Sequence, residues 1–147
     1  MADLPGAVLF CCTMNAVRSV MAEGLMKYLY GRAVYIDSVG VRSGEIDHFA
    51  VAVMDEIGID VSRHRSKSFD DLDDDSYDLV ISLSPQAQHS AVEMTRTMAC
   101  EVEFWNTFDP TYVEGSRETR LDAYRQVRDN LMARIKERFG TAPPPVV

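Results

Sequence analysis

Five residues separate Cys12 from Arg18 near the amino terminus, and these two side chains suit chemistry on a phosphate-like oxyanion. The apolar run 7–11 predicts a buried strand that ends before Cys12, and the apolar positions from Met21 onward predict a helix. A strand-to-helix turn directs backbone amides and the positive end of the helix dipole at a bound anion. These groups and Arg18 favour thiolate over thiol, so we expect Cys12 to be a nucleophile at neutral pH.

Arg18 and Ser19 complete the chemistry expected at this turn. The planar guanidinium of Arg18 matches two phosphate oxygens at once, and the hydroxyl of Ser19 is placed to donate a hydrogen bond to the Cys12 thiolate. The pattern Cys-x5-Arg-Ser is typical of cysteine-dependent phosphatases, although Cys-x5-Arg alone recurs by chance. Cys11 and Cys100, in contrast, are expected to be buried, inert core residues.

Three features together give a resemblance to a known family: segment 12–19 with Asn15 three residues after the cysteine, the continuation Met-Ala-Glu-Gly at 21–24, and Asp109-Pro110 far downstream. On these motifs the chain resembles the low-molecular-weight protein tyrosine phosphatases and the thioredoxin-linked arsenate reductases that share their fold. The resemblance covers nearly the whole chain. It implies an α/β fold: a single three-layer domain over residues 1–140, with a four-stranded parallel sheet in the order 2-1-3-4 and helices on both faces. A flexible Pro-rich tail is expected at 141–147.

The resemblance also implies roles for particular residues. Cys12 is the expected nucleophile, Arg18 and its loop hold the phosphate, and Asp109, on a loop beside Pro110, is the expected general acid. The residues expected to bind phosphate are Thr13, Met14, Asn15, Ala16, Val17, Arg18 and Ser19. Asn15, Ser19 and Ser38 are expected to support the loop from behind through a hydrogen bond between Ser38 and Asn15, although an ordinary strand-end serine fits Ser38 equally well.

The expected activity is hydrolysis of phosphate monoesters, in phosphotyrosine proteins or small aryl phosphates, through a phosphocysteine intermediate. One alternative is a thiol-dependent arsenate reductase, but Ser84 stands about where reductases of the similar family place their resolving cysteine. A second alternative is a phosphate-binding module without turnover. Asp109 speaks against a pure binder, because binding alone has no use for an acid.

Two residues depart from the family pattern. Met14 stands where the family usually has glycine, and a methionine is costly there if the position requires a positive φ. The Met14 side chain is also expected to narrow the mouth of the site. Val17 replaces the second cysteine of the eukaryotic-type phosphatases. Trp105, Tyr112 and Phe49 either line a cleft for a flat aromatic substrate or belong to the core.

Composition limits the class of protein. The 147 residues are 46% hydrophobic and 26% charged, as expected of one globular domain without a signal peptide or membrane span. A net charge of −8 argues against binding to nucleic acid or anionic membranes. Three cysteines indicate a reducing compartment, so a cytoplasmic location is expected. The expected partner is a phosphorylated protein or a small phosphomonoester, and the expected state is a monomer or weak homodimer.

No metal or cofactor is expected, because His48, His64 and His89 show no ligand spacing to one another or to a cysteine. His64 belongs to the polar, basic segment 59–67, which the resemblance assigns to the fold and not to the chemistry. The acidic run 69–78 is expected to be a solvated loop or the N-terminus of a helix.

Local patterns predict the remaining elements. Strands are expected over 33–38, 78–83 and 101–105. Helices are expected from the Asp47 cap to a stop at Gly58, over 86–94, and from the Ser116 cap onward. The apolar positions that define the helical faces are Met21, Leu25, Tyr28 and Leu29; Ala50, Val53, Met54 and Ile57; and Leu121, Tyr124, Val127, Leu131, Ile135 and Phe139.

Overall fold

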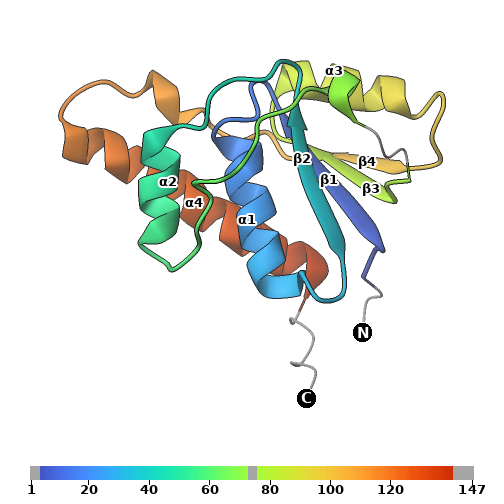
Figure 1. Cartoon of the computed structure of the whole chain (residues 1–147), viewed down its shortest axis with the longest axis horizontal. Helices are drawn as coiled ribbons and strands as arrows, with labels where there is room; N and C mark the ends of the chain where they lie inside the picture. Colours follow the sequence, from blue (N-terminus) through green and yellow to red (C-terminus); the bar gives the residue numbers. More distant parts are fainter. Residues whose placement is uncertain (1–3, 73–75, 141–147) are drawn as a thin grey trace.

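A computed structural model describes residues 4–72 and 76–140 of the chain. Its four strands, β1 (Ala7–Cys12), β2 (Tyr35–Gly40), β3 (Leu79–Ser82) and β4 (Glu101–Phe104), form one sheet. All neighbouring strands are parallel and their order is β2-β1-β3-β4, as the resemblance implies (Figure 1). The central strand β1 therefore has a neighbour from each half of the chain, and ligands of such sheets bind beyond the carboxyl ends of the strands.

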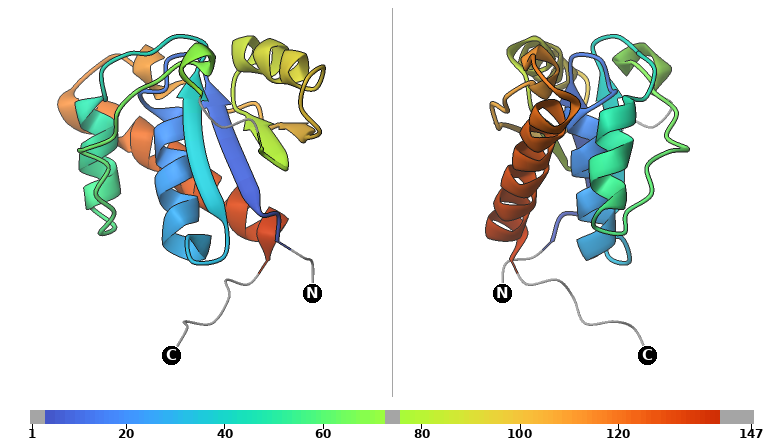
Figure 2. Two further views of the ribbon diagram at one scale, coloured as in Figure 1. Left: turned by 45° about the vertical axis from the view of Figure 1, so that its right-hand side comes forward. Right: turned by 90° about the vertical axis from the view of Figure 1, so that its left-hand side faces the viewer.

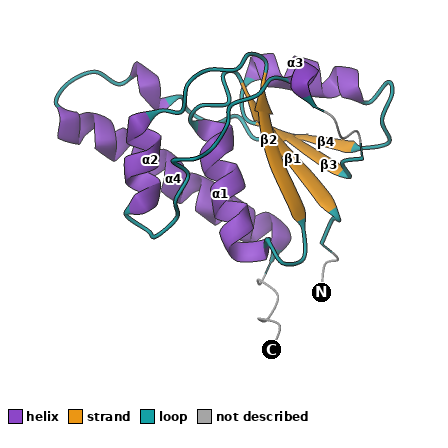
Figure 3. Cartoon of the chain, viewed as in Figure 1, coloured by secondary structure: helices purple, strands orange, loops and turns teal. Residues whose placement is uncertain are grey.

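Helices cover both faces of the sheet (Figures 2 and 3). The helices are α1 (Arg18–Tyr30), α2 (His48–Asp55), α3 (Pro85–Met94) and α4 (Arg117–Phe139), with two short 3-10 helices, η1 (Phe69–Asp71) and η2 (Pro110–Tyr112). Residues of α1, α2 and α4 share one core cluster, whereas α3 packs on the opposite face. The result is the three-layer α/β domain that the sequence predicts.

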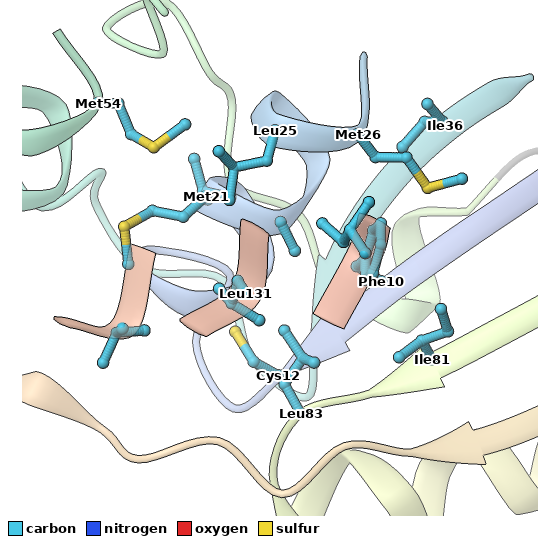
Figure 4. Close-up of a cluster of buried hydrophobic side chains, with 14 of the residues drawn as sticks. Phe10, Cys12, Met21, Leu25, Met26, Ile36, Met54, Ile81, Leu83 and Leu131 are labelled. Atoms are coloured by element: carbon cyan, nitrogen blue, oxygen red, sulfur yellow. The ribbon is translucent and has the colours of Figure 1, made fainter. Parts of the chain in front are cut away.

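The period-2 alternation of β1 divides its side chains between the two cores. Phe10 and Cys12 point to the α1 and α4 side, where Figure 4 shows them among Leu25, Ile81 and Leu131. The alternate residues Leu9 and Cys11 point to the other face of the sheet and belong to the smaller cluster beneath α3. Both faces of β1 are thus closed to water, which explains its continuous apolar run.

Two predicted strand boundaries are wrong. β1 includes Cys12, which pairs with Gly40, so the cysteine is the last strand residue and does not lie beyond the strand. β2 runs from Tyr35 to Gly40, two residues later than the predicted 33–38, because residues 31–34 form the turn after α1. The carboxyl end of β2 therefore lies beside the end of β1 and the turn that follows Cys12.

The predicted helices form, with differences at two positions. The caps at Asp47 and Ser116 are confirmed, since each side chain accepts hydrogen bonds from the first helical turn. Tyr28 is 64% exposed, so its predicted place on the buried face of α1 is wrong. The second helix ends at Asp55 and not at Gly58, and Ile57 lies exposed in the turn where Ile57 N–H donates to Met54 O.

The last helix agrees with its predicted pattern throughout: all six apolar positions are buried. In the acidic run, Asp70 and Asp71 lie in η1, while residues 73–75 fall outside the described residues. The predicted tail at 141–147 also lies outside them. In the part of the chain that the structure describes, no helix is long and apolar enough to cross a membrane.

Candidate functional site

The segment 12–19, here called the phosphate loop, joins the carboxyl end of β1 to α1. Cys12 is only 2% exposed, and its Sγ lies 2.9 Å from Ser19 Oγ. Ser19 Oγ accepts a hydrogen bond from Asn15 Nδ2 at 2.9 Å, which leaves the hydroxyl proton of Ser19 free to point at the sulfur. The expected contact between Ser19 and the Cys12 sulfur is therefore present.

Asn15 fixes the shape of the phosphate loop. Its φ of 50° lies in the left-handed region, which asparagine tolerates better than most residues. Its Nδ2 donates to Ser19 and to Ser38 Oγ, both at 2.9 Å, and its Oδ1 accepts from Lys67 N at 3.0 Å and contacts His64 Nε2 at 2.9 Å. The expected hydrogen bond to Ser38 is present. Both the NH2 group and the oxygen of the buried Asn15 amide form hydrogen bonds.

His64 lies behind the phosphate loop, where the sequence did not place a functional residue. Because Asn15 Oδ1 is an acceptor, His64 Nε2 carries the proton of that contact. Burial lowers the pKa of His64, which favours the neutral ring, although Glu23 at 3.9 Å from Nδ1 opposes the shift. Glu23 in turn accepts from Ser38 Oγ at 2.6 Å. No local spacing signals His64, because 49 residues separate it from Asn15.

Lys67, whose backbone N–H donates to Asn15, also forms an ion pair with Asp37. Its Nζ lies 2.7 Å from Asp37 Oδ1. Burial, the largest single effect, lowers the pKa of Lys67, but the hydrogen bond to Asp37 and the charges of Asp37 and Glu23 together outweigh it, so the pKa is raised. Gly40 at the end of β2 allows the close approach that this packing needs, since a Cβ there would lie 2.6 Å from Asn15 N.

Met14 occupies an unstrained position, so the cost expected for a side chain there is not present. Asn15 is the only residue other than glycine with a positive φ in the described ranges. Met14 is 40% exposed, and its side chain lies against Gly44 of the loop that follows β2. Ser66 Oγ donates to Met14 O at 3.1 Å and accepts from Gly44 N at 2.9 Å, which ties the two loops together.

Arg18 joins the phosphate loop to the loop after β4. Its Nη1 donates to Thr107 O at 3.0 Å, and its Nη2 lies 3.6 Å from Asp109 Oδ2. Asp109 Oδ1 accepts from both Thr111 N and Thr111 Oγ1, at 3.0 and 2.7 Å, and so caps η2. The structure thus brings Asp109 to the phosphate loop, within reach of a group held by Arg18.

The other predicted loop residues surround this centre. Thr13 Oγ1 donates to Ser84 Oγ at 3.1 Å, and Ser84 caps α3 by accepting from Ala87 N. Ala16 is half-buried and its carbonyl accepts from Asp47 N at 3.3 Å. Val17 is buried in the core.

The three candidate aromatic residues have different environments. Trp105 is buried and its ring packs between Phe10 and Phe139, so it belongs to the core. Phe49 is half-buried against Tyr124, and Tyr112 is 79% exposed. Of the three, Phe49 and Tyr112 alone have surface available to a ligand.

The two other cysteines lie away from the Cys12 sulfur. Cys11 is fully buried on the opposite face of the sheet, and burial, assisted by the charge of Cys12, raises the pKa of its thiol. Cys100 precedes β4 at the amino ends of the strands; it is partly buried, which corrects the expected fully buried position. Burial raises the pKa of Cys100 as well. The described residues contain no group of three or more potential metal-ligating side chains.

Comparison with known proteins identifies the family. Residues 7–140 match the model of the family described as low molecular weight phosphotyrosine protein phosphatase. The chain belongs to this family. A "Glutaredoxin arsenate reductase" of Synechocystis is 33% identical over 129 residues, which are 88% of this chain and 92% of the relative. An "Arsenate reductase" of Halalkalibacterium halodurans is 35% identical over 130 residues, covering 88% and 91% of the two chains.

Solved structures agree with this assignment. The low molecular weight protein tyrosine phosphatase of T. tengcongensis is 30% identical, with a TM-score of 0.74, and covers 90% of this chain and 97% of its own. The fold and family predicted from the sequence are confirmed. The chain is therefore a member of a family of cysteine-based enzymes. The proteins of this fold that are similar to it include both phosphatases and arsenate reductases.

Proposed function

We propose that this protein hydrolyses phosphate monoesters, of phosphotyrosine or small aryl phosphates, through a phosphocysteine intermediate. The observation that carries the proposal is that Cys12 and Arg18 lie on one short loop and that Asp109 lies against it. Cys12 Sγ lies beside the Ser19 hydroxyl, and Arg18 lies 3.6 Å from the Asp109 carboxylate. A nucleophile, a phosphate-binding guanidinium and a proton donor are the groups that such a reaction requires.

In the first step, the Cys12 sulfur attacks phosphorus and forms the S–P bond as the bond from phosphorus to the leaving oxygen breaks. Asp109 gives its proton to that oxygen. The phosphate loop from Thr13 to Ser19 and the Arg18 guanidinium hold the equatorial oxygens. The Ser19 hydroxyl stabilises the sulfur anion both before attack and on release.

In the second step, water attacks phosphorus and the S–P bond breaks, which returns the thiolate of Cys12. Asp109, now a carboxylate, accepts the proton of that water. Arg18 and Asp109 lie close enough in this structure for one bound phosphoryl group to contact both. The loop backbone and Arg18 keep the same oxygens throughout, so the two steps need no second binding site.

Arsenate reduction is the second candidate, because the relatives described above carry that name. In that reaction the sulfur of Cys12 binds arsenic, and a second thiol attacks the sulfur, forming a disulfide as the electron pair passes to arsenic and arsenite leaves. Ser84, not a cysteine, lies beside Thr13, and the thiols of Cys11 and Cys100 lie on the opposite face of the sheet and at its other end. These positions support the phosphatase, since reduction would need a thiol from another molecule.

The test compares wild type with Cys12→Ser in steady-state hydrolysis of an aryl phosphate. The variant is expected to lose on the order of 10⁴-fold or more in kcat while it still binds phosphate or vanadate, because Arg18 and the loop remain. Cys100→Ser is the matched control and is expected to keep wild-type turnover. Undiminished hydrolysis by Cys12→Ser would end the proposal.

A parallel assay measures arsenate turnover with dithiothreitol or glutathione as the thiol. Negligible turnover by a protein that hydrolyses aryl phosphates supports the phosphatase. After peroxide treatment, mass spectrometry is expected to show Cys12 oxidised beyond the sulfenic acid and without an internal disulfide. A disulfide from Cys12 to Cys11 or Cys100, together with arsenate turnover, would favour the reductase.

A further inference from the structure

Two arginines flank one aromatic ring at the edge of the site. The Cζ atoms of Arg120 and Arg117 lie 4.6 and 5.4 Å from the centroid of the Phe49 ring. Phe49 is half-buried, Arg117 is exposed and Arg120 is partly exposed. Phe49, Arg117 and Arg120 are called the arginine patch below. Guanidinium groups stacked on a ring keep their N–H edges available to an acceptor.

Two hydrogen bonds and one ring contact connect the arginine patch to the phosphate loop. Asp47, which begins α2, donates its backbone N–H to Ala16 O at 3.3 Å. The Tyr124 hydroxyl donates to Asp47 Oδ2 at 2.9 Å, and the Tyr124 ring packs on Phe49 at 5.4 Å between centroids. The patch is therefore connected, through Tyr124 and Asp47, to the loop that is proposed to bind phosphate.

Tyr124 also connects the patch to the acid. Burial and the hydrogen bond to Asp47 raise the pKa of Tyr124; the charge of Arg120 acts against this shift and the charge of Asp109 adds to it. Both charges are thus close to one hydroxyl. Figure 1 shows the first turns of α2 and α4 at the same end of the molecule as the loop that carries η2. The patch and Asp109 therefore share one rim of the site.

The patch arginines differ from Arg125 and Arg128 of the same helix. Arg125 and Arg128 are held by Glu56, at 2.8 Å each. Within residues 4–72 and 76–140, neither Arg117 nor Arg120 forms an ion pair with a carboxylate. In a chain of net charge −8, two such cations at the rim of an anion site indicate a negatively charged partner.

We propose that Arg117 and Arg120, supported by Phe49, bind a second anionic group of the substrate: an acidic side chain near the phosphotyrosine of a phosphopeptide. The proposal rests on the proposed function and narrows its substrate class. The phosphate occupies the loop while a glutamate or aspartate of the same peptide pairs with the patch. Charge complementarity favours an acidic peptide, because the chain has a net charge of −8 and neither patch arginine has a carboxylate partner among the described residues.

The experiment measures kcat/KM for matched phosphotyrosine peptides that carry glutamate or glutamine at successive positions on either side of the phosphotyrosine. Wild type is expected to prefer the best glutamate peptide about 10-fold at low salt, as two ion pairs at the surface allow. This preference should shrink as salt is added. The double variant Arg117→Gln/Arg120→Gln is expected to turn over the two peptides about equally. Arg32→Gln, in the exposed turn after α1, is the control and should keep the wild-type preference.

A binding measurement separates this proposal from the proposed function. The affinity of the same peptides for the Cys12→Ser protein, with and without the two arginine substitutions, is measured by fluorescence anisotropy, which needs no turnover. Equal affinity for glutamate and glutamine peptides in Cys12→Ser overturns the proposal even if wild type hydrolyses aryl phosphates. Equal losses for both peptides in the double arginine variant overturn it as well, because the arginines would then act through Asp109 and not on the substrate.

Discussion

The phosphate loop after β1 and the loop of residues 106–116 after β4, here called the acid loop, meet at one site but are held in different ways. In the phosphate loop, Cys12, Asn15 and Ser19 are buried and joined by hydrogen bonds. In the acid loop, Phe108 is 60% and Tyr112 is 79% exposed. Most of the first loop is held in the core, whereas the second is anchored by the buried residues Thr107 and Pro110 and is otherwise largely at the surface.

This difference follows from what each loop is proposed to do. Groups that stabilise charge on phosphorus work best when they are already oriented, because no reorganisation is then needed during reaction. A proton donor must serve leaving groups of several shapes, which a surface loop with few buried contacts allows. Changes in the phosphate loop should therefore affect stability and activity together, and changes in the acid loop should affect activity alone.

Asp109→Asn tests the acid loop and has the largest expected effect. Hydrolysis of substrates with poor leaving groups should fall by about 10²–10⁴-fold, because a general acid contributes that much. Substrates with good leaving groups should lose far less, and the free energy of unfolding should stay near that of wild type. Steady-state kinetics across a series of aryl phosphates and urea unfolding measure both.

Glu114→Gln, an exposed change in the same acid loop, is the control for Asp109→Asn and should leave the leaving-group dependence intact. Equal losses across the series would place the acid at another residue.

Asn15→Ala tests the phosphate loop. The change removes the Asn15 donor to Ser38 Oγ, removes the acceptor of the Lys67 N–H and puts alanine in a left-handed conformation. The free energy of unfolding is expected to fall by about 3 kcal/mol, and aryl phosphate turnover should fall with it. Urea unfolding and kinetics on the same preparation check both losses.

Asn106→Ala, on the exposed start of the acid loop, is the control for Asn15→Ala and should change stability little. If Asn15→Ala unfolds like wild type, the hydrogen bonds of Asn15 do not hold the phosphate loop together.

Met14→Gly has a smaller expected effect. Because φ of Met14 is not positive, glycine relieves no strain and adds freedom to the unfolded chain. The free energy of unfolding should fall by about 0.5–1 kcal/mol. Thermal or urea unfolding measures this change, and an increase in stability would show that methionine is strained at this position.

His64→Gln should change only the pH dependence of stability. Burial lowers the pKa of His64 below the ordinary value of 6.5, so the unfolded chain binds more protons than the folded chain below that pH. The stabilisation is thus complete above pH 6.5 and is lost as pH falls from 6.5 through the folded-state pKa. Glutamine keeps a donor toward Asn15 but does not titrate, so the variant should lack this loss.

Urea unfolding at a series of pH values measures the effect of His64→Gln, with His89→Gln, an exposed change on α3, as the control. Parallel pH curves for wild type and His64→Gln would contradict the prediction.

The sequence by itself determined the elements and the residues of the phosphate loop. The apolar positions of α4 repeat at helical spacing and all six are buried, and the caps Asp47 and Ser116 stand where their helices begin. These features depend on neighbours within a few residues along the chain, so periodicity and turn chemistry reveal them. The spacing from Cys12 to Arg18 is local in the same sense.

Only the tertiary structure decided which distant residues support and complete the site. Arg18 donates to the carbonyl of Thr107, 89 residues away, and His64 contacts Asn15 across 49 residues. The same is true of the exposed position of Tyr28 and of the pairing of Cys12 with Gly40. Such contacts depend on strand order and register, which place the carboxyl ends of β1, β2 and β3 side by side. No local pattern encodes them, because the residues that meet there come from different elements of the chain.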